Sequence, residues 1–230
     1  MGHAGMAAAA VRYLRADPAD RSRRTTHPEA AVEALPRPEL RCVGADERAP
    51  VDQAEFRRVL GNFATGVTVI TAPPSPPSAG DPAATGHLTG HLDGLPDDRP
   101  AGFACQSFSS LSLDPPLVAF MVGRTSTTWP RIARAGVFCV NVLGADQGDL
   151  CRSFAVSGAD KFAGVAHTPA PATGSPRLTG AAAWIDCTIH AVHTGGDHLI
   201  VVGRVKALGT DDEAMGPLLF HRGRFGRLRA

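Results

Sequence analysis

A series of short apolar runs, rich in β-branched residues and bounded by turn residues, limits the folds open to this chain. The runs are 4 to 12 residues long, as strands usually are, and the segments of helical period between them are few and irregular. Repeated βαβ units would need a helix after each strand, so antiparallel pairing is favoured. We therefore predict a mainly β fold, an antiparallel β-barrel with a few peripheral helices. The runs are VTVIT (67–71), GFACQS (102–107), LVAFMVG (117–123), VFCVNVL (137–143), residues 183–194, residues 198–208 and LLFH (218–221).

Helices are predicted at the edges of this barrel. Asp52 and Glu55 have the D-x-x-E spacing of a helix start, and apolar residues then recur every three or four positions as far as Phe63. Gly66 is expected to close this first helix. Two more helices are predicted, one from Pro130, because proline suits a first helical turn, and one over Asp146 to Phe154.

The domain organisation follows from composition. A length of 230 residues suits one domain, and 43% hydrophobic residues can build a sizeable core. Residues 1–50 mix alanine, arginine, acidic residues and proline, with Tyr13 as the one aromatic residue, so we predict a disordered N-terminal extension. Residues 72–100 are rich in proline and glycine and predict a long flexible insertion. The folded domain is thus expected over residues 51–230.

The charge balance argues against two classes of partner. A net charge of +1 and a pI near 7.8 give no general attraction to nucleic acid or to an anionic membrane, so any anion site must be local. No apolar run approaches the roughly 20 residues that a spanning helix needs. A cytoplasmic protein is therefore expected. The five cysteines are widely spaced, without C-x-x-C, and are expected to be small buried residues rather than disulfide or zinc ligands.

Several common catalytic signatures are missing from the sequence. No G-x-S-x-G, P-loop or G-x-G-x-x-G follows a predicted strand, which argues against triad hydrolysis, P-loop phosphoryl transfer and Rossmann dinucleotide binding. We expect no metal site. His190 and His193 have odd spacing on one predicted strand, so they would point to opposite faces unless a bulge intervenes.

Two stretches can carry chemistry. QSFSSLSLDPPL (106–117) places four serines between two apolar strands, and on its own it is equally consistent with a loop whose hydroxyls bond to main chain. GGDHLIVVGRV (195–205) sets an acid and a histidine at the mouth of a strand. Those two residues suit either a hairpin turn or a binding site at a strand end.

Five blocks in this order resemble the flavin reductase family of short-chain NAD(P)H:flavin oxidoreductases, which includes the reductase components of two-component flavin monooxygenases. The resemblance runs from about residue 56 to residue 228 and implies a homodimeric split β-barrel of Greek-key type, with FMN or FAD in a groove near the subunit interface. The blocks are SFSSLSLDPPL (107–117), RTSTTWPRI (124–132), FCVNVL (138–143), GDHLIVVGRV (196–205) and FHRGRFGRL (220–228).

The resemblance also implies roles for individual residues. Residues lining the isoalloxazine would be Gln106, Ser107, Phe108, Ser109 and Ser110, supported by Ser112. Residues meeting the ribityl phosphate would be Ser126 and Thr128, ahead of the helix at Pro130, with Arg124 nearby. A helix N-terminus with free amides suits an anion. The nicotinamide pocket would be formed by Asp197 and His198 and flanked by Arg224 and Phe225.

The activity implied is reduction of FMN or FAD by NADH or NADPH, with the reduced flavin leaving by diffusion to a separate monooxygenase. Two alternatives stay open: a non-catalytic flavin-binding carrier, and a reductase whose flavin passes electrons to ferric iron. Relatives usually carry threonine and asparagine where this chain has Ala104 and Gln106. Those departures are expected to weaken flavin binding or to change the flavin preferred.

Overall fold

The computed structural model describes residues 51–74, 99–158, 160–211 and 216–228. The predicted extension (1–50) and most of the predicted insertion (72–100) lie outside these residues. The elements are α2 (Gln53–Leu60), β1 (Thr65–Gly66), β2 (Thr68–Ala72), β3 (Ala101–Cys105), β4 (Ser109–Leu113), β5 (Pro116–Gly123), α3 (Trp129–Ala135), β6 (Val137–Val142), α4 (Gly148–Ala155), β7 (His167–Pro169), β8 (Pro176–Leu178), β9 (Ala183–Gly195), β10 (His198–Thr210), β11 (Leu218–His221) and β12 (Arg224–Arg227).

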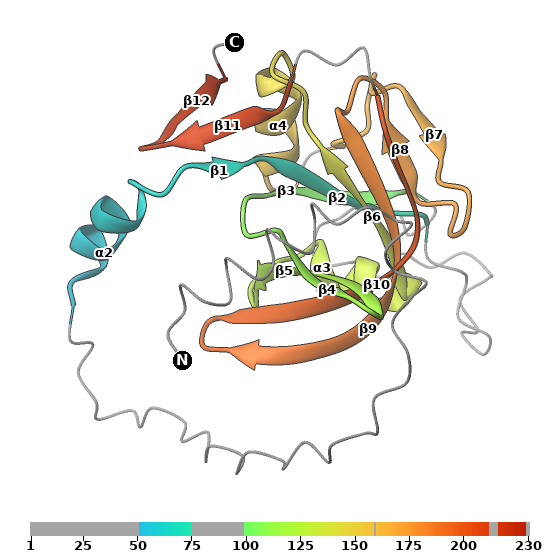
Figure 1. The fold of residues 1–230 in the computed structure, drawn as a ribbon, viewed down its shortest axis with the longest axis horizontal. Helices are drawn as coiled ribbons and strands as arrows, with labels where there is room; N and C mark the ends of the chain where they lie inside the picture. The colour runs from blue at the N-terminus through green and yellow to red at the C-terminus, as the bar shows by residue number, and fades with distance from the viewer. Residues whose placement is uncertain (1–50, 75–98, 159, 212–215, 229–230) are drawn as a thin grey trace, which may run out of the picture. The chain divides into compact units, whose positions relative to one another are not determined.

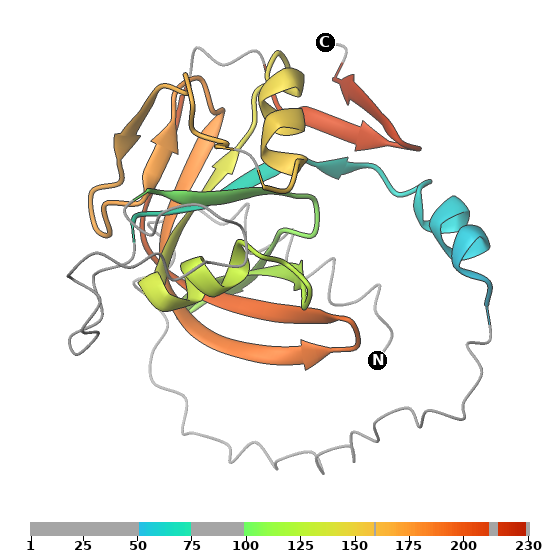
Figure 2. The same ribbon diagram turned by 180° about the vertical axis from the view of Figure 1, so that it is seen from behind.

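Seven strands form one curved antiparallel sheet in the order β3-β2-β6-β9-β10-β5-β4 (Figure 1). A second sheet has the order β1-β11-β12, and β7 pairs with β8. Both α3 and α4 pack against β2 and β3 and lie on the side seen in Figure 2. The predicted mainly β split barrel is confirmed. Because β3 and β4 end the large sheet, hydrogen bonds do not close the barrel, and an opening remains beside β3.

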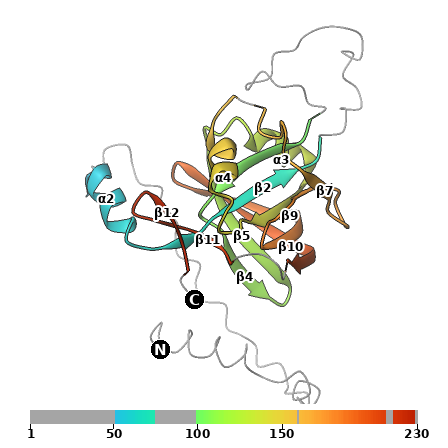
Figure 3. The same cartoon turned by 90° about the horizontal axis from the view of Figure 1, so that it is seen from above.

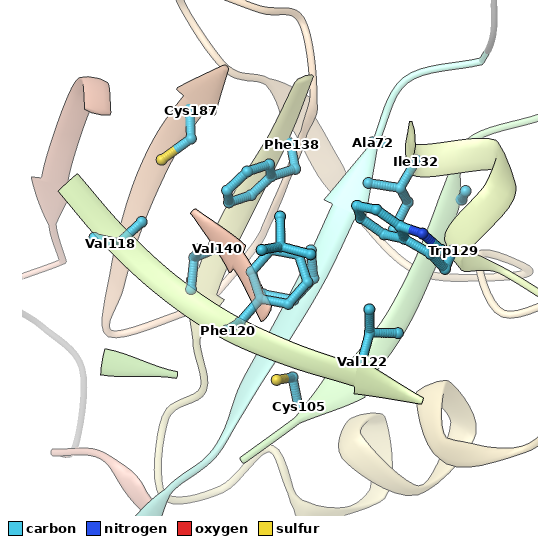
Figure 4. Packing of buried hydrophobic residues seen from close by; sticks show 13 residues of the cluster. Ala72, Cys105, Val118, Phe120, Val122, Trp129, Ile132, Phe138, Val140 and Cys187 are labelled. Atoms are coloured by element: carbon cyan, nitrogen blue, oxygen red, sulfur yellow. The ribbon is translucent and has the colours of Figure 1, made fainter. Parts of the chain in front are cut away.

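The core of the barrel centres on Phe120 of β5, which is fully buried (Figure 4). Its ring meets Phe138 edge-on at 5.1 Å, Trp129 at 6.2 Å and Phe103 at 6.0 Å between ring centroids. Such tilted aromatic pairs each add roughly 0.5–1.5 kcal/mol beyond area burial. Strand β5, strand β3 and helix α3 are therefore held together by one aromatic cluster directly beneath the opening.

The described cysteines are free and buried, as predicted. Burial raises the pKa of Cys139 and of Cys187 to about 12, which keeps both thiols protonated and unreactive near neutral pH. Cys151 belongs to a second apolar cluster beneath α4, and Cys105 lies at the barrel opening. Cys42 lies outside the described residues.

Three details differ from the predictions, and the short strands β1, β7 and β8 were not predicted. The first helix ends at Leu60 instead of reaching Gly66, because the Asn62 side-chain amide donates to the carbonyls of Arg58 and Val59 and ends the helix there. Residues 109–113 form an edge strand where a serine loop was expected. Residues 224–227 form β12, which was missed because glycine and arginine hide its alternation. No helix in the described ranges is long and apolar enough to cross a membrane.

Strand β9 contains a bulge between His193 and Ile189, where His190 and His193 were expected to point to opposite faces unless a bulge intervened. Its pairing with β10 jumps from Ala191 opposite Val202 to Ile189 opposite Gly203, so His190 is the extra residue. Within the described residues, no group of three or more histidine, cysteine, aspartate or glutamate side chains is placed to hold a metal ion.

Gly203 yields a stability prediction. A Cβ at this position would lie 2.3 Å from Cζ of the buried Phe138, so Gly203→Ala must displace that ring. Overpacking of this kind costs about 1–3 kcal/mol, and Tm should fall by about 2–4 °C for each kcal/mol. Gly66→Ala is the matched control, since a Cβ there meets nothing within 4 Å. Thermal unfolding of the two variants measures the difference; equal Tm values would contradict the packing argument.

Candidate active site

A groove of about 350 Å³ occupies the opening of the barrel. Its two sides are the end of β3 and the end of β5, which lie close together without pairing. Its lining residues are Phe103, Ala104, Cys105, Gln106, Ser107, Met121, Val122, Gly123, Ser126 and His198. Four of the residues predicted from the sequence, Gln106, Ser107, Ser126 and His198, are therefore brought together here from three separate segments.

Ser107 joins the two sides of the groove. Its hydroxyl donates to the Met121 carbonyl at 3.0 Å and accepts from the Met121 amide at 3.1 Å. The hydroxyl hydrogen is thus used within the protein, so Ser107 fixes the width of the groove rather than offering that hydrogen to a ligand. Burial raises the pKa of the neighbouring Cys105 thiol, which lies 3.4 Å from the Ser107 oxygen.

Asp197 and His198 form a pair at the rim. The Asp197 carboxylate lies 2.7 Å from Nδ1 of His198. The other ring nitrogen, Nε2, faces β5, since a Cβ built on Gly123 would lie 4.0 Å from it. The Asp197 carbonyl accepts from the Arg124 amide at 3.0 Å and fastens the β9–β10 turn to the end of β5. The imidazole is therefore oriented with Nε2 available to the groove.

The pair changes the acidity of the carboxylate. The hydrogen bond with His198, together with its electrostatic attraction, lowers the pKa of Asp197. Both side chains are exposed, so salt screens this effect. The consequence is orientation: Asp197 stays ionised near neutral pH and holds one tautomeric arrangement of the ring.

Ser126 and Thr128, predicted to act together, face different places. The Ser126 hydroxyl accepts from the Trp129 amide at 3.2 Å and so caps α3 while lining the groove. Thr128 is buried, and its hydroxyl lies 3.5 Å from Nζ of Lys161. It lines a small pocket that sequence reasoning missed.

This small pocket, which we call the Lys161 pocket, is basic. Its lining includes Arg99, Arg131, Lys161, Thr128 and Asp160. Arg99 pairs with Asp160 at 2.5 Å, and Lys161 donates to the Gly102 carbonyl at 3.1 Å. Spacing could not have revealed this set, because Lys161 is 33 residues from Thr128 and 59 from Gly102.

The groove and the Lys161 pocket are lined by residues that are neighbours in the chain. On β3, Phe103 lines the groove and Gly102 lines the pocket; after β5, Ser126 lines the groove and Thr127 the pocket. An elongated ligand with a ring system at one end and a phosphate at the other matches this order of surfaces.

The remaining predicted residues lie outside the lining of the groove. Phe108 is half-buried against the barrel core, and Ser109 donates to the Ser110 carbonyl at 2.9 Å. Ser110 and Ser112 lie on β4 beside β5, and Arg124 is exposed after β5. Their roles toward a ligand stay predictions.

Phe225 and Arg224 lie on β12, away from the groove's lining. The Phe225 ring packs edge-on against Phe220 at 5.5 Å and lies beneath the guanidinium of Arg152 at 5.1 Å. It lines a different groove, of about 230 Å³, between α4 and β12. One copy of the described chain therefore does not bring Phe225 to His198.

Comparison with known proteins identifies the family of this chain. Residues 60–229 match the family described as flavin reductase like domain. The chain belongs to the flavin reductase family. This reductase is 44% identical over 182 residues to the flavin-dependent monooxygenase reductase subunit HsaB of Rhodococcus jostii, covering 79% of this chain and 81% of that protein. It is 43% identical over 183 residues to a flavin reductase of Pseudomonas putida, covering 80% and 94%.

Solved structures agree with the family assignment. The reductase superposes with a TM-score of 0.64 and 42% identity on a nitrilotriacetate monooxygenase component B homologue from Mycobacterium thermoresistibile, covering 77% of this chain and 87% of the other. The Streptomyces globisporus NADH:FAD oxidoreductase SgcE6, solved with NAD and FAD fragments, gives a TM-score of 0.64 at 34% identity, covering 80% and 98%.

The Asp197–His198 pair predicts a pH effect. The folded pKa of Asp197 lies below its ordinary value of about 3.9, so stabilisation by the pair is present above that value and is lost as pH falls through the lowered pKa. Replacing His198 with alanine should raise the carboxyl pKa toward about 3.9. NMR titration of Asp197 measures this, with His193→Ala on the same hairpin as control. An unchanged pKa in His198→Ala would refute the pairing.

Proposed function

We propose that the flavin ring of FMN or FAD occupies the groove at the barrel opening, with its phosphate at the Lys161 pocket. The chain is a flavin reductase: NADH or NADPH reduces the flavin, which supplies a separate monooxygenase. The observation that carries the residue assignment is that neighbouring residues of β3, and of the segment after β5, line the groove with His198 at its rim and the basic Lys161 pocket.

The residues present fit a flavin. Phe103 and Met121 give the groove an apolar lining, and Gln106 offers an amide that can donate and accept. A volume of about 350 Å³ lies in the usual range for sites of small organic molecules. When bound, a flavin accepts a hydride from nicotinamide, which requires the two rings to stack at near-attack distance. The protein's task is therefore positioning.

His198 is the residue we assign to orienting the rings. Asp197 holds Nδ1, so Nε2 is left to hydrogen-bond a ring edge or carry a proton at the groove. Ser107 keeps β3 and β5 at a fixed separation, which sets how closely two stacked rings fit. Lys161 and Thr128 would bind the phosphate by charge-assisted and hydroxyl hydrogen bonds.

Ala104 and Gln106 both line the groove, so the departures noted in the sequence fall where the ring would lie. Alanine supplies no hydroxyl there, and each lost hydrogen bond would cost about 1 kcal/mol of flavin affinity. Loose binding suits a reductase whose flavin leaves in reduced form.

The test is NADH or NADPH oxidation by the purified protein with FMN or FAD. The wild type should turn over with saturation in flavin. His198→Ala should lower kcat by about 100-fold, the lower end of the range for a positioned proton donor or acceptor. Lys161→Gln should instead raise the KM for flavin by about 10-fold, near the lower end of what losing one charged hydrogen bond implies. Swapped effects would overturn the residue assignment.

The same assay separates the alternatives. Flavin binding without nucleotide oxidation would favour the carrier. With ferric iron or a monooxygenase added as acceptor, faster electron transfer to the iron than to the monooxygenase would favour the ferric reductase. His193→Ala, on the same hairpin but outside the groove, is the matched control for His198→Ala.

A homodimer belongs to the proposal, and helix α2 supports it. None of its eight residues is buried by the described part of the chain, although its apolar side chains lie along one side. Phe56 is 56% exposed and Leu60 is 54% exposed. Helices this short are marginal alone in water, so α2 needs a surface to cover that side. A second copy would supply it, and could bring its Arg224 and Phe225 to this groove.

The dimer predicts a change in mass. Replacing both Phe56 and Leu60 with serine should shift the protein toward monomer at micromolar concentration, because burial of these side chains supplies about 1.5–3 kcal/mol each. Light scattering after size exclusion measures this. Leu208→Ser, at a site 66% exposed on β10, is the control. A monomeric wild type would remove the dimer from the proposal.

For location we propose the cytoplasm, where the free thiols would stay reduced.

A further inference from the structure

A second large cavity lies outside the groove, between the end of α2 and the tip of the β11–β12 hairpin. Its volume is about 470 Å³, and we call it the arginine pocket. Figure 3 shows α2 beside these strands, at one side of the barrel. The lining residues are Arg57, Arg58, Gly61, Asn62, Arg222 and Gly223.

The frame of the arginine pocket is fixed by Asn62. Its amide nitrogen donates to the carbonyls of Arg58 and Val59 at the end of α2, at 3.0 and 2.9 Å. Its oxygen accepts from Nε of Arg222 at 2.9 Å, and the Arg222 amide donates to the Gly61 carbonyl at 3.0 Å. Arg222 has a φ of 47°, a left-handed conformation unfavourable for a residue with a side chain. The β11–β12 turn keeps this unfavourable conformation, and it holds the Arg222 guanidinium at the end of α2.

The charges of the pocket are unbalanced. Three arginines and no acidic residue are among the lining residues, and Arg58 pairs with Glu55 through contacts of 2.6 and 2.7 Å. Arg222 is held by the neutral Asn62. The Arg57 guanidinium has no hydrogen-bond or ion-pair partner among the residues that the structure describes. An anion entering the pocket would thus meet an uncompensated arginine.

The pocket stays open if α2 is covered by a partner. At 100° per residue, Phe56 and Leu60 lie within about 40° of one another, while Arg57 and Arg58 lie about 100° and 200° round from Phe56. Arg58 therefore lies opposite the apolar side chains, and Arg57 lies at their edge, about 60° from Leu60. A subunit on the apolar side leaves the arginine pocket in contact with solvent.

We infer that the arginine pocket binds phosphate groups that the Lys161 pocket leaves free, either those of the nicotinamide nucleotide or the second phosphate of FAD. This inference rests on the proposed function, since both substrates of the reaction carry phosphate. Guanidinium groups match phosphate in shape and charge and bind it through paired N–H donors. The net charge of the whole chain is only +1, so attraction of polyanions must come from local clusters such as this one.

The test compares Arg57→Gln with Arg204→Gln, which removes the same charge from an exposed position on β10. Arg57→Gln should raise the KM for one substrate about 5-fold with kcat unchanged, and Arg204→Gln should not. Separate arms with NADH, NADPH, FMN and FAD identify the nucleotide. Glu55→Gln, which releases Arg58, should lower the same KM. Equal KM values in Arg57→Gln and Arg204→Gln in every arm would overturn the inference.

Calorimetry with ADP as probe separates this inference from the proposed function. The full-length wild type should bind ADP, and Arg57→Gln should weaken that binding about 5-fold at low salt, whether or not NADH is oxidised. Turnover with unchanged ADP binding in Arg57→Gln would leave the reductase standing and refute the pocket. If the wild type shows no turnover but Arg57→Gln still weakens ADP binding, the pocket stands and the reductase assignment fails. A far-ultraviolet circular dichroism spectrum confirms that α2 remains folded in each variant.

Discussion

The incomplete closure of the barrel is the constraint from which the site follows. Strand β3 pairs with β2 on one side only, and its other edge faces the end of β5 without a ladder of hydrogen bonds. An open edge would ordinarily leave main-chain groups to water. Here Phe120 packs beneath the opening with Phe103 and Trp129, and the Ser107 hydroxyl joins the two strands above it. Tight packing below and sparse hydrogen bonding above leave a rigid space between two strands, which is what a reaction dependent on ring stacking requires.

Much of the fold could be predicted because its strands are apolar, short and bounded by turns. The β5, β6, β9 and β10 segments were expected nearly to the residue. Edge strands were harder. Ser109–Leu113 alternates serine with leucine yet leaves Leu111 and Leu113 exposed, so its sequence is typical of a loop as much as of a strand. Residues 224–227 pack Phe225 alone, and burial of a single residue gives no period to read.

Site residues could be predicted where they are neighbours in the sequence, and could not be predicted where folding brings distant segments together. Asp197 and His198 are adjacent, so their pairing was within reach of sequence reasoning. Thr128 and Ser126 were expected side by side, but Thr128 lines the Lys161 pocket and Ser126 lines the groove, because residues next to a helix start can face either side of it. Lys161 gave no signal, since the contact that gives it meaning joins segments far apart in the chain. Resemblance to a family supplies residue types at matching positions, and only three-dimensional structure says which of them face one another.

The register of β10 links the core to the site in a way that constrains change. Gly203 lies beneath the Phe138 ring, and the same strand begins five residues earlier with His198 opposite Gly123. A shift of one residue along β10 would drive a side chain into Phe138 and turn His198 to the other face of the sheet. The position of His198 at the groove is therefore tied to the position of Gly203 in the core. Insertions in the two-residue turn at Gly196 and Asp197 could lengthen the loop without moving the strand. An insertion within residues 198–203 would move either His198 or Gly203 out of its present register.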